Sequence, residues 1–266
     1  MSTESTGATR RQFAIGAIGA LGVAVVPVVA CTQGDDTDTG GEWASGGTAS
    51  MSGTYPDPFE DDLGTTCAIV CATTLGPCYA QTLERRDISE GYPGLPVRLA
   101  FRVVDDTCTP VEGAVVDIWH TSAAGLYSGD DAITFCTTGD ADAESHRFFR
   151  GTQTTDAAGR CDFDTCFPGW YPGRAIHFHF QVRRGADAYI TSQLFFPQAV
   201  IDDVFANHPD YVAYGAPSTT NASDGIFPSD DPEPYTLQWA RMSDGAMQAW
   251  KTIAIRSSLA QASCTA

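Results

Sequence analysis

Between residues 97 and 196 the chain alternates apolar residues with less apolar ones in short runs. A period of two is typical of strands that bury one face. Turn residues separate the runs, as at Asp156-Ala157-Ala158-Gly159-Arg160. Helical periodicity is sparse, and one helix is expected at 199–207. This spacing predicts one largely β domain, a sandwich or barrel rather than βαβ units. Strands are expected at 97–104, 114–119, 152–155, 161–165, 177–182 and 190–196.

Residues 1–31 have the features of an export segment. The twin arginines in Thr9-Arg10-Arg11-Gln12-Phe13 precede an apolar run over 14–30. Val28-Val29-Ala30-Cys31 resembles a bacterial lipobox, so Cys31 is expected to carry lipid and to begin the mature chain. A transmembrane anchor is the alternative, although the run is short for a span and contains Pro27. We therefore expect an exported cell-envelope lipoprotein that faces the periplasm or the exterior and is held only by its lipid anchor.

The composition changes after the expected lipid site. Residues 32–66 are rich in Gly, Ser, Thr and Asp and poor in large apolar side chains, which predicts a flexible linker. Residues 67–266 are then expected to form the folded domain. The formal net charge is −18, and Lys251 is the single lysine. An acidic surface without a basic stripe argues against binding to nucleic acid or to anionic lipid.

The nine cysteines fit an oxidising compartment. With Cys31 set aside for lipid, eight remain, and an even number in an exported protein predicts disulfides of unknown pairing. A thiolate metal site is the alternative, but the cysteine spacings do not match the CxxC pattern of a zinc ribbon. The eight are Cys67, Cys71, Cys78, Cys108, Cys136, Cys161, Cys166 and Cys264.

A candidate metal-binding pattern begins at His177-Phe178-His179. In a strand these two imidazoles project from one face, which suits two ligands of one metal. Taken alone, a His-x-His pair is also common at surface or core positions that bind no metal. A Pro/Gly-rich turn just upstream places Tyr171 and Arg174 near the same face. A phenolate is a hard anionic ligand that favours a trivalent ion, although a buried tyrosine with a satisfied hydroxyl is the simpler interpretation of Tyr171 alone.

Several segments in order resemble the intradiol ring-cleavage dioxygenases, the family that contains protocatechuate 3,4-dioxygenase and catechol 1,2-dioxygenase. The resemblance spans about residues 75–196, and its lack of an N-terminal helical region places the chain nearer an exported, protocatechuate-type branch. It implies an antiparallel β-sandwich with long loops and little helix, and makes 67–266 the catalytic domain. The matching segments are Leu75-Gly76-Pro77-Cys78-Tyr79, Val116-Asp117-Ile118-Trp119-His120, Gly125-Leu126-Tyr127, Arg150-Gly151-Thr152-Gln153-Thr154-Thr155-Asp156, the Pro-Gly-x-Tyr turn, Arg174-x-x-His177-x-His179 and Ile190-Thr191-Ser192-Gln193-Leu194-Phe195-Phe196.

Carried over residue by residue, the resemblance implies a non-haem iron(III) enzyme that opens catechol-type rings with O2. The Tyr171 phenolate would leave the metal with a substrate proton when catechol chelates. Arg174 would stabilise the electron-rich ring, and Gln193 would support it. Trp119 and Tyr79 would lie at the substrate pocket, although Trp119 is equally a core residue by type. The implied iron ligands are Tyr127, Tyr171, His177 and His179.

Two other functions remain open at this level. One is a non-catalytic exported lipoprotein that binds an aromatic ligand or a metal, although a binder has no need of Arg174. The other is a zinc hydrolase using His177 and His179, which lacks a third His or carboxylate at suitable spacing. Only Pro172 and Gly173 separate Tyr171 from Arg174, so we expect an open pocket that accepts larger or substituted catechols. Neither the preferred catechol nor the oligomeric state follows from the sequence.

Overall fold

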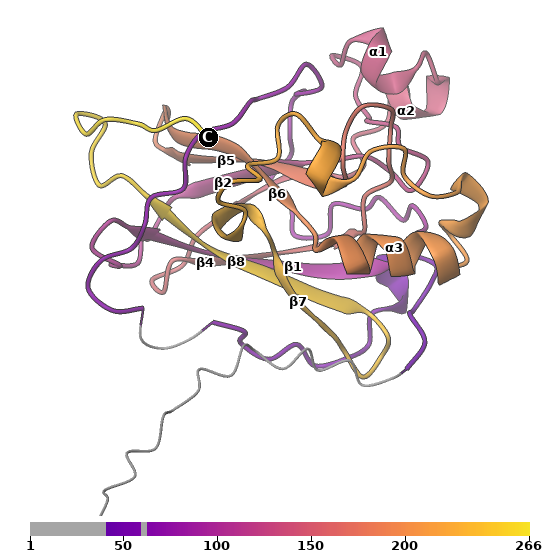
Figure 1. Ribbon diagram of the computed structural model, residues 1–266, viewed down its shortest axis with the longest axis horizontal. Coiled ribbons are helices and arrows are strands. Elements are labelled where there is room, and N and C mark those ends of the chain that lie inside the picture. Colours follow the sequence, from indigo (N-terminus) through magenta and orange to yellow (C-terminus); the bar gives the residue numbers. More distant parts are fainter. Residues whose placement is uncertain (1–40, 60–62) are drawn as a thin grey trace, which may run out of the picture. The chain divides into compact units, whose positions relative to one another are not determined.

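The computed structural model of the protein describes residues 41–59 and 63–266 (Figure 1). The expected export segment, including Cys31, lies outside the described residues. In the two described ranges, no helix has both the length and the apolar character needed to cross a bilayer.

In the part of the chain that the structure describes, eight strands form two four-stranded sheets. The first sheet has the order β4-β1-β8-β7 and the second has the order β3-β2-β5-β6. Neighbouring strands are antiparallel except β1 and β8, which run parallel. The strands are β1 (Pro96–Asp105), β2 (Val115–Trp119), β3 (Arg150–Thr154), β4 (Arg160–Cys166), β5 (His177–Arg184), β6 (Asp187–Phe195), β7 (Gln238–Arg241) and β8 (Met247–Ile255).

Helical structure in the described residues is short. The longest helix is α3 (Gln198–Asn207), and α1 (Thr134–Thr137) and α2 (Ala141–Ser145) occupy the connection between β2 and β3 (Figure 1). Single 3-10 turns lie at Thr48–Ser50, Val212–Tyr214, Asn221–Ser223 and Glu233–Tyr235.

The core lies between the two sheets, where alternate side chains of the strands point inward. Leu99 and Phe101 of β1 and Phe178 and Phe180 of β5 have no exposed surface and belong to one apolar cluster. The rings of Phe101 and Phe180 join the sheets, with centroids 6.3 Å apart. Burial of such a side chain contributes roughly 1.5–3 kcal/mol, so this packing fixes which face of each strand points inward.

The opposite face of the second sheet carries a row of polar and aromatic side chains. Trp119 of β2 pairs in register with His179 of β5, and His179 pairs with Gln193 of β6. Arg150 of β3 pairs with Trp119 from the other side. Side chains directly opposite one another project from the same face of a sheet, so these four residues form a continuous row directed away from the core.

The all-β sandwich expected from the sequence is confirmed. The six expected strands occur with ends shifted by up to three residues, and the expected helix at 199–207 is α3. The sequence analysis missed β7 and β8, and did not foresee a parallel pair. Because β8 pairs with β1 from more than 140 positions further along the chain, no local pattern indicated where it would lie.

Residues 41–59 pack against the domain. The Trp43 Nε1 donates to Asp203 Oδ2 at 2.7 Å, and the Arg241 guanidinium lies 3.8 Å from the centroid of the Trp43 ring. The Tyr55 hydroxyl donates to Asp244 Oδ2 at 2.9 Å. Trp43 and Tyr55 thus hold residues 41–59 against the domain, within the range 32–66 that the sequence predicts as a flexible linker. Residues 32–40 and 60–62 lie outside the described residues.

Six of the eight cysteines form disulfides, as Cys67–Cys108, Cys71–Cys264 and Cys78–Cys136. The prediction that all eight would pair is wrong for Cys161 and Cys166, which are buried free thiols. Both lie on β4, five residues apart, so they project from opposite faces. A five-residue rise separates their Cα atoms by roughly 17 Å, whereas a disulfide needs about 4.4–6.8 Å.

The Cys71–Cys264 disulfide links the segment before β1 to the C-terminal tail across 193 positions. The chain-entropy account of loop closure gives it about 5 kcal/mol of stabilisation. We predict that the Cys71→Ser/Cys264→Ser double variant loses up to that amount, measured by urea unfolding under oxidising conditions. Wild-type protein treated with reductant serves as the comparison. An unfolding midpoint equal to that of oxidised wild type would show that this bond does not constrain the unfolded chain.

Candidate metal centre

Four potential donor atoms converge at the outer face of the second sheet. His177 Nε2 lies 3.2 Å from His179 Nε2 and 3.4 Å from the hydroxyl oxygens of both Tyr127 and Tyr171. The histidines come from β5, Tyr127 follows β2, and Tyr171 lies in the turn before β5. The structure therefore brings together the four residues expected as metal ligands.

These spacings fit a bound metal ion. Bonds of about 2.0–2.2 Å from one ion to N and O donors separate neighbouring donors by roughly 3–4 Å. Among the residues that the structure describes, no cluster of three or more His, Cys, Asp or Glu side chains is arranged to hold a metal. A metal held by His177 and His179 would therefore draw on the two phenol oxygens, a hard donor set that suits iron(III).

Neighbouring groups fix the orientation of both imidazoles. The Nδ1 of His177 lies 2.6 Å from the Ala175 carbonyl oxygen, so Nδ1 carries the proton and Nε2 presents its lone pair to the centre. The His179 ring stacks on Trp119 with a centroid distance of 5.0 Å and an interplanar angle of 9°. On its other edge, a Cβ added to Gly76 would lie 2.8 Å from His179 Cε1, so only glycine leaves room for the ring there.

Burial keeps the donor groups neutral in the absence of a cation. It lowers the pKa of His177 to about 3, and Arg174 contributes in the same direction. Burial likewise lowers the pKa of His179. The same desolvation raises the pKa values of Tyr127 and Tyr171. Two neutral imidazoles and two phenols surround the point of convergence, so a metal ion would bind with release of phenol protons.

Arg174 is held next to this centre by two partners. Its Nε donates to Asp224 Oδ2 at 3.0 Å, and its Nη2 donates to Gln193 Oε1. Gln193 is fully buried and is also oriented by the Thr74 carbonyl oxygen, at 3.4 Å from its Nε2. The expected support of Arg174 by Gln193 therefore exists as a direct hydrogen bond.

Asp224 is a site residue that the sequence analysis missed. Its side chain is completely buried, and its Oδ2 accepts both from Arg174 and from the backbone N–H of Ala175, the latter at 2.6 Å. The Ala175 carbonyl in turn fixes His177, so one carboxylate positions a cation and a ligand. The hydrogen bonds of Asp224 lower the pKa of its carboxyl despite the opposing effect of burial, so it is ionised. An Asp some 50 positions downstream in a polar loop gives no local sign of this role.

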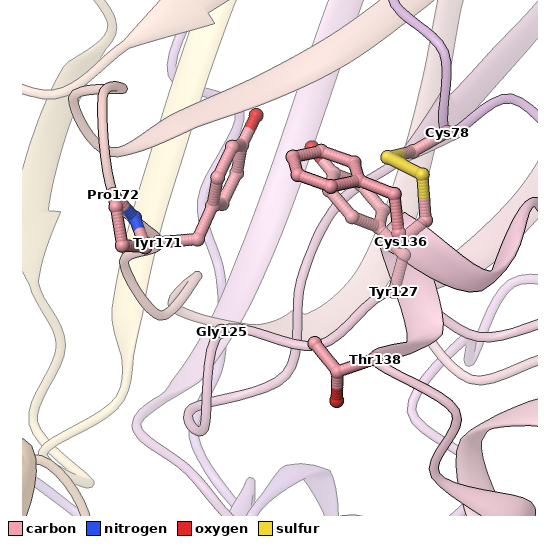
Figure 2. Close-up of a pocket in the computed structure, with 8 residues that line it drawn as sticks. Cys78, Gly125, Tyr127, Cys136, Thr138, Tyr171 and Pro172 are labelled. Atoms are coloured by element: carbon pink, nitrogen blue, oxygen red, sulfur yellow. A yellow bond between two sulfur atoms is a disulfide. The ribbon is translucent and has the colours of Figure 1, made fainter.

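A cavity of about 150 Å³ adjoins the two tyrosines. Figure 2 shows Tyr171 and Pro172 on one side of it, and Tyr127 with the Cys78–Cys136 disulfide on the other. An engineered apolar cavity of about this volume accepts benzene, so an aromatic ring fits here. The lining residues are Cys78, Gly125, Tyr127, Phe135, Cys136, Thr138, Tyr171 and Pro172.

Tyr79 and Trp119, expected at the substrate pocket, do not line this cavity. Trp119 is fully buried, and Tyr79 meets it edge-on with ring centroids 4.9 Å apart. The Tyr79 hydroxyl donates to Asp117 Oδ2 at 3.1 Å, and burial raises the pKa of that carboxyl to about 6. The two aromatic residues pack in one cluster with Tyr127 and support the His179 ring rather than contacting the cavity.

The β-sandwich thus carries a candidate tyrosine–histidine donor set. Similarity to known proteins identifies the family of the chain. A family model described as Dioxygenase matches residues 74–222, more than half of the chain, and the chain belongs to the intradiol ring-cleavage dioxygenase family. Residues 74–222 include all four candidate donor residues, Tyr127, Tyr171, His177 and His179.

Individual relatives are distant. The chain is 28% identical to a chlorocatechol 1,2-dioxygenase of Pseudomonas sp. (strain P51), over 45% of this chain and 50% of that protein. It is 28% identical to the protocatechuate 3,4-dioxygenase beta chain of Burkholderia cepacia, over 52% of this chain and 62% of that protein. The chain thus spans about half to three fifths of the length of these curated relatives. Among solved structures, an intradiol ring-cleavage dioxygenase from Tetranychus urticae superposes with a TM-score of 0.63 at 26% identity, covering 71% of this chain and 95% of that one.

The charge of Asp224 can be removed without changing the size of its side chain. Asp224→Asn keeps the size of the side chain but removes the charge that orients Arg174 and the Ala175 peptide. Loss of an outer partner of a ligand costs about 10–100-fold in metal affinity. We expect that decrease for iron(III), measured by competition with a chelator.

The matched control is Asp230→Asn, because Asp230 is an exposed acid in the same loop region. Wild-type iron affinity in the Asp224→Asn protein, with the fold intact by circular dichroism, would contradict the positioning role.

Proposed function

We propose that the chain is a non-haem iron(III) dioxygenase that opens catechol-type rings between the two hydroxyl-bearing carbons. The observation that supports it most is the convergence of the His179 imidazole and two phenol oxygens within 3.2–3.4 Å of His177 Nε2, next to a ring-sized cavity. Both oxygen atoms of O2 enter the product, a cis,cis-muconate-type dicarboxylic acid, and no external reductant is needed.

The metal supplies one chemical property that the side chains lack. Tyr127, Tyr171, His177 and His179 would hold an iron(III) ion, which would supply the Lewis acidity that makes a catechol ring susceptible to dioxygen. The remaining tasks belong to the protein: to bind the ring, to take up its protons and to stabilise developing charge.

Tyr171 is placed to accept a proton from a catechol hydroxyl at its Oη. It lines the cavity and is half-buried, whereas Tyr127 is only 2% exposed. Both phenols line the cavity, and the greater exposure of Tyr171 favours it as the one that a substrate would displace. Arg174 favours the ionised form of both phenols, although burial has the larger opposing effect on their pKa values. The same positive charge favours negative charge that develops on a ring bound beside it.

The two other functions considered from the sequence fit the site less well. A zinc hydrolase would need to use phenol oxygens, which are poor ligands for zinc. A non-catalytic metal or aromatic binder would not need a buried carboxylate and a buried amide to hold Arg174 at the centre. Turnover measurements separate the binder from the enzyme.

We also propose that the protein is exported as a lipoprotein. The support is the twin-arginine pair ahead of an apolar run that ends in Val28-Val29-Ala30-Cys31, together with three disulfides. Disulfides persist in oxidising compartments. Lipid labelling of the wild type but not of a Cys31→Ala variant would be expected, and equal labelling of both would contradict the anchor.

The visible spectrum of the iron-loaded protein tests the metal proposal. We expect a phenolate-to-iron(III) charge-transfer band that shifts when catechol is added without oxygen. Tyr127→Phe and Tyr171→Phe should each weaken the band, because each removes one phenolate. Tyr171→Phe should also lower kcat by about 100-fold or more, the usual contribution of a positioned acid–base group.

Tyr214→Phe provides the matched control, since Tyr214 is exposed and distant from the donor set in sequence. A colourless protein that retains no iron after careful loading would reject the proposal and leave the binding lipoprotein as the better account.

A further inference from the structure

The segment after Tyr127 forms a fixed apolar rim at the cavity. Phe135 lies in α1 and lines the cavity, yet 68% of its surface is exposed, more than for any other large apolar residue in the described ranges. Exposure of an aromatic ring to water forfeits much of the stabilisation that burial would give. An exposed ring at the mouth of a cavity is therefore available to a ligand.

Two bonds hold this rim in place. Cys136 is joined to Cys78 by a disulfide, and its carbonyl oxygen accepts from the backbone N–H of Tyr127 at 3.0 Å. The rim is thus tied directly to the residue that supplies one phenol donor. Thr138 closes α1 with a left-handed conformation, φ 55°. Phe135 consequently stands at a defined position relative to the donor set.

The residues that line the cavity disfavour a substrate with a charged ring substituent. None of the eight lining residues carries a charged side chain, and their polar atoms include three hydroxyl groups, those of Tyr127, Tyr171 and Thr138. The cation beside the site, Arg174, already serves Asp224 and Gln193. A carboxylate on the substrate ring would lose hydration in this cavity without gaining a partner. The net charge of −18 further disfavours the approach of an anion.

We infer that Phe135 and the Cys78–Cys136 disulfide form a specificity wall that selects catechols with an uncharged, apolar ring substituent over carboxylated ones. This inference rests on the proposed function and names the substrate class for the same site. In this arrangement the cavity of about 150 Å³ holds the ring, and the substituent extends past the disulfide onto the exposed Phe135 side chain.

Steady-state kinetics of the iron-loaded full chain test the inference with catechol, 4-propylcatechol and protocatechuate. For wild type we expect kcat/KM for 4-propylcatechol to exceed that for protocatechuate at least tenfold. In Phe135→Ala the ratio of kcat/KM for 4-propylcatechol to kcat/KM for catechol should fall about tenfold, the low end for a lost methylene-sized contact. Phe135→Arg should raise kcat/KM for protocatechuate, because it supplies the missing cation at the rim.

Leu259→Ala is the matched control, since Leu259 is an exposed apolar residue in the C-terminal tail that does not line the cavity. It should leave all three substrates unaffected. A wild-type preference for protocatechuate, or an equal loss for all three substrates in Phe135→Ala, would overturn the inference.

A second measurement distinguishes failure of the proposed function from failure of the specificity wall. If wild type turns over none of the three compounds, binding without oxygen is measured by calorimetry with 4-propylcatechol and protocatechuate. Tighter binding of 4-propylcatechol that weakens about tenfold in Phe135→Ala would support the wall even though the enzyme proposal had failed. Equal affinity for the two compounds in wild type would overturn the inference as well.

Discussion

The arrangement of the site depends on the two-residue period of β5. Phe178 and Phe180 must enter the core, where they meet side chains of the first sheet. The alternation of the strand then forces His177 and His179 onto the opposite face, with both Nε2 atoms 3.2 Å apart. A shift of one residue in this strand would bury the histidines in the apolar core and expose the phenylalanines, so the hydrophobic effect that stabilises the sandwich also orients the candidate ligands.

The neighbouring strands and loops supply the residues that orient the histidines of β5 and Arg174. In-register pairing places Trp119 and Gln193 on either side of His179, one as a stacking surface and the other as an anchor for Arg174. Asp224 then connects Arg174 with the peptide that fixes His177. Because Gln193, Asp224 and His177 are buried, leaving their polar groups unpaired would be costly, and the network therefore holds one arrangement. A centre prepared in this way needs little rearrangement to accept a metal ion.

The disulfides join segments that lie outside the eight described strands. Cys78–Cys136 ties the loop that carries Phe135 to the segment before the first core strand, and so shapes a cavity that short helices alone would not keep rigid. Cys71–Cys264 secures the C-terminal tail. Cys161 and Cys166 remain thiols because one extended strand keeps them on opposite faces.

The sequence pattern alone predicted a largely β domain, six of the eight described strands and a cluster of Tyr171, Arg174, His177 and His179, because alternation and short spacings are local properties of the chain. The family resemblance added the sandwich, Tyr127 and Gln193, which lie far from that cluster in sequence. Only the tertiary structure decided the parallel pairing of β1 with β8, the role of Asp224, the cysteine pairing and the cavity wall at Phe135. Each of these depends on contacts between distant segments. Packing and burial in the whole domain determine such contacts, and they produce no periodic pattern in the sequence of the residues concerned.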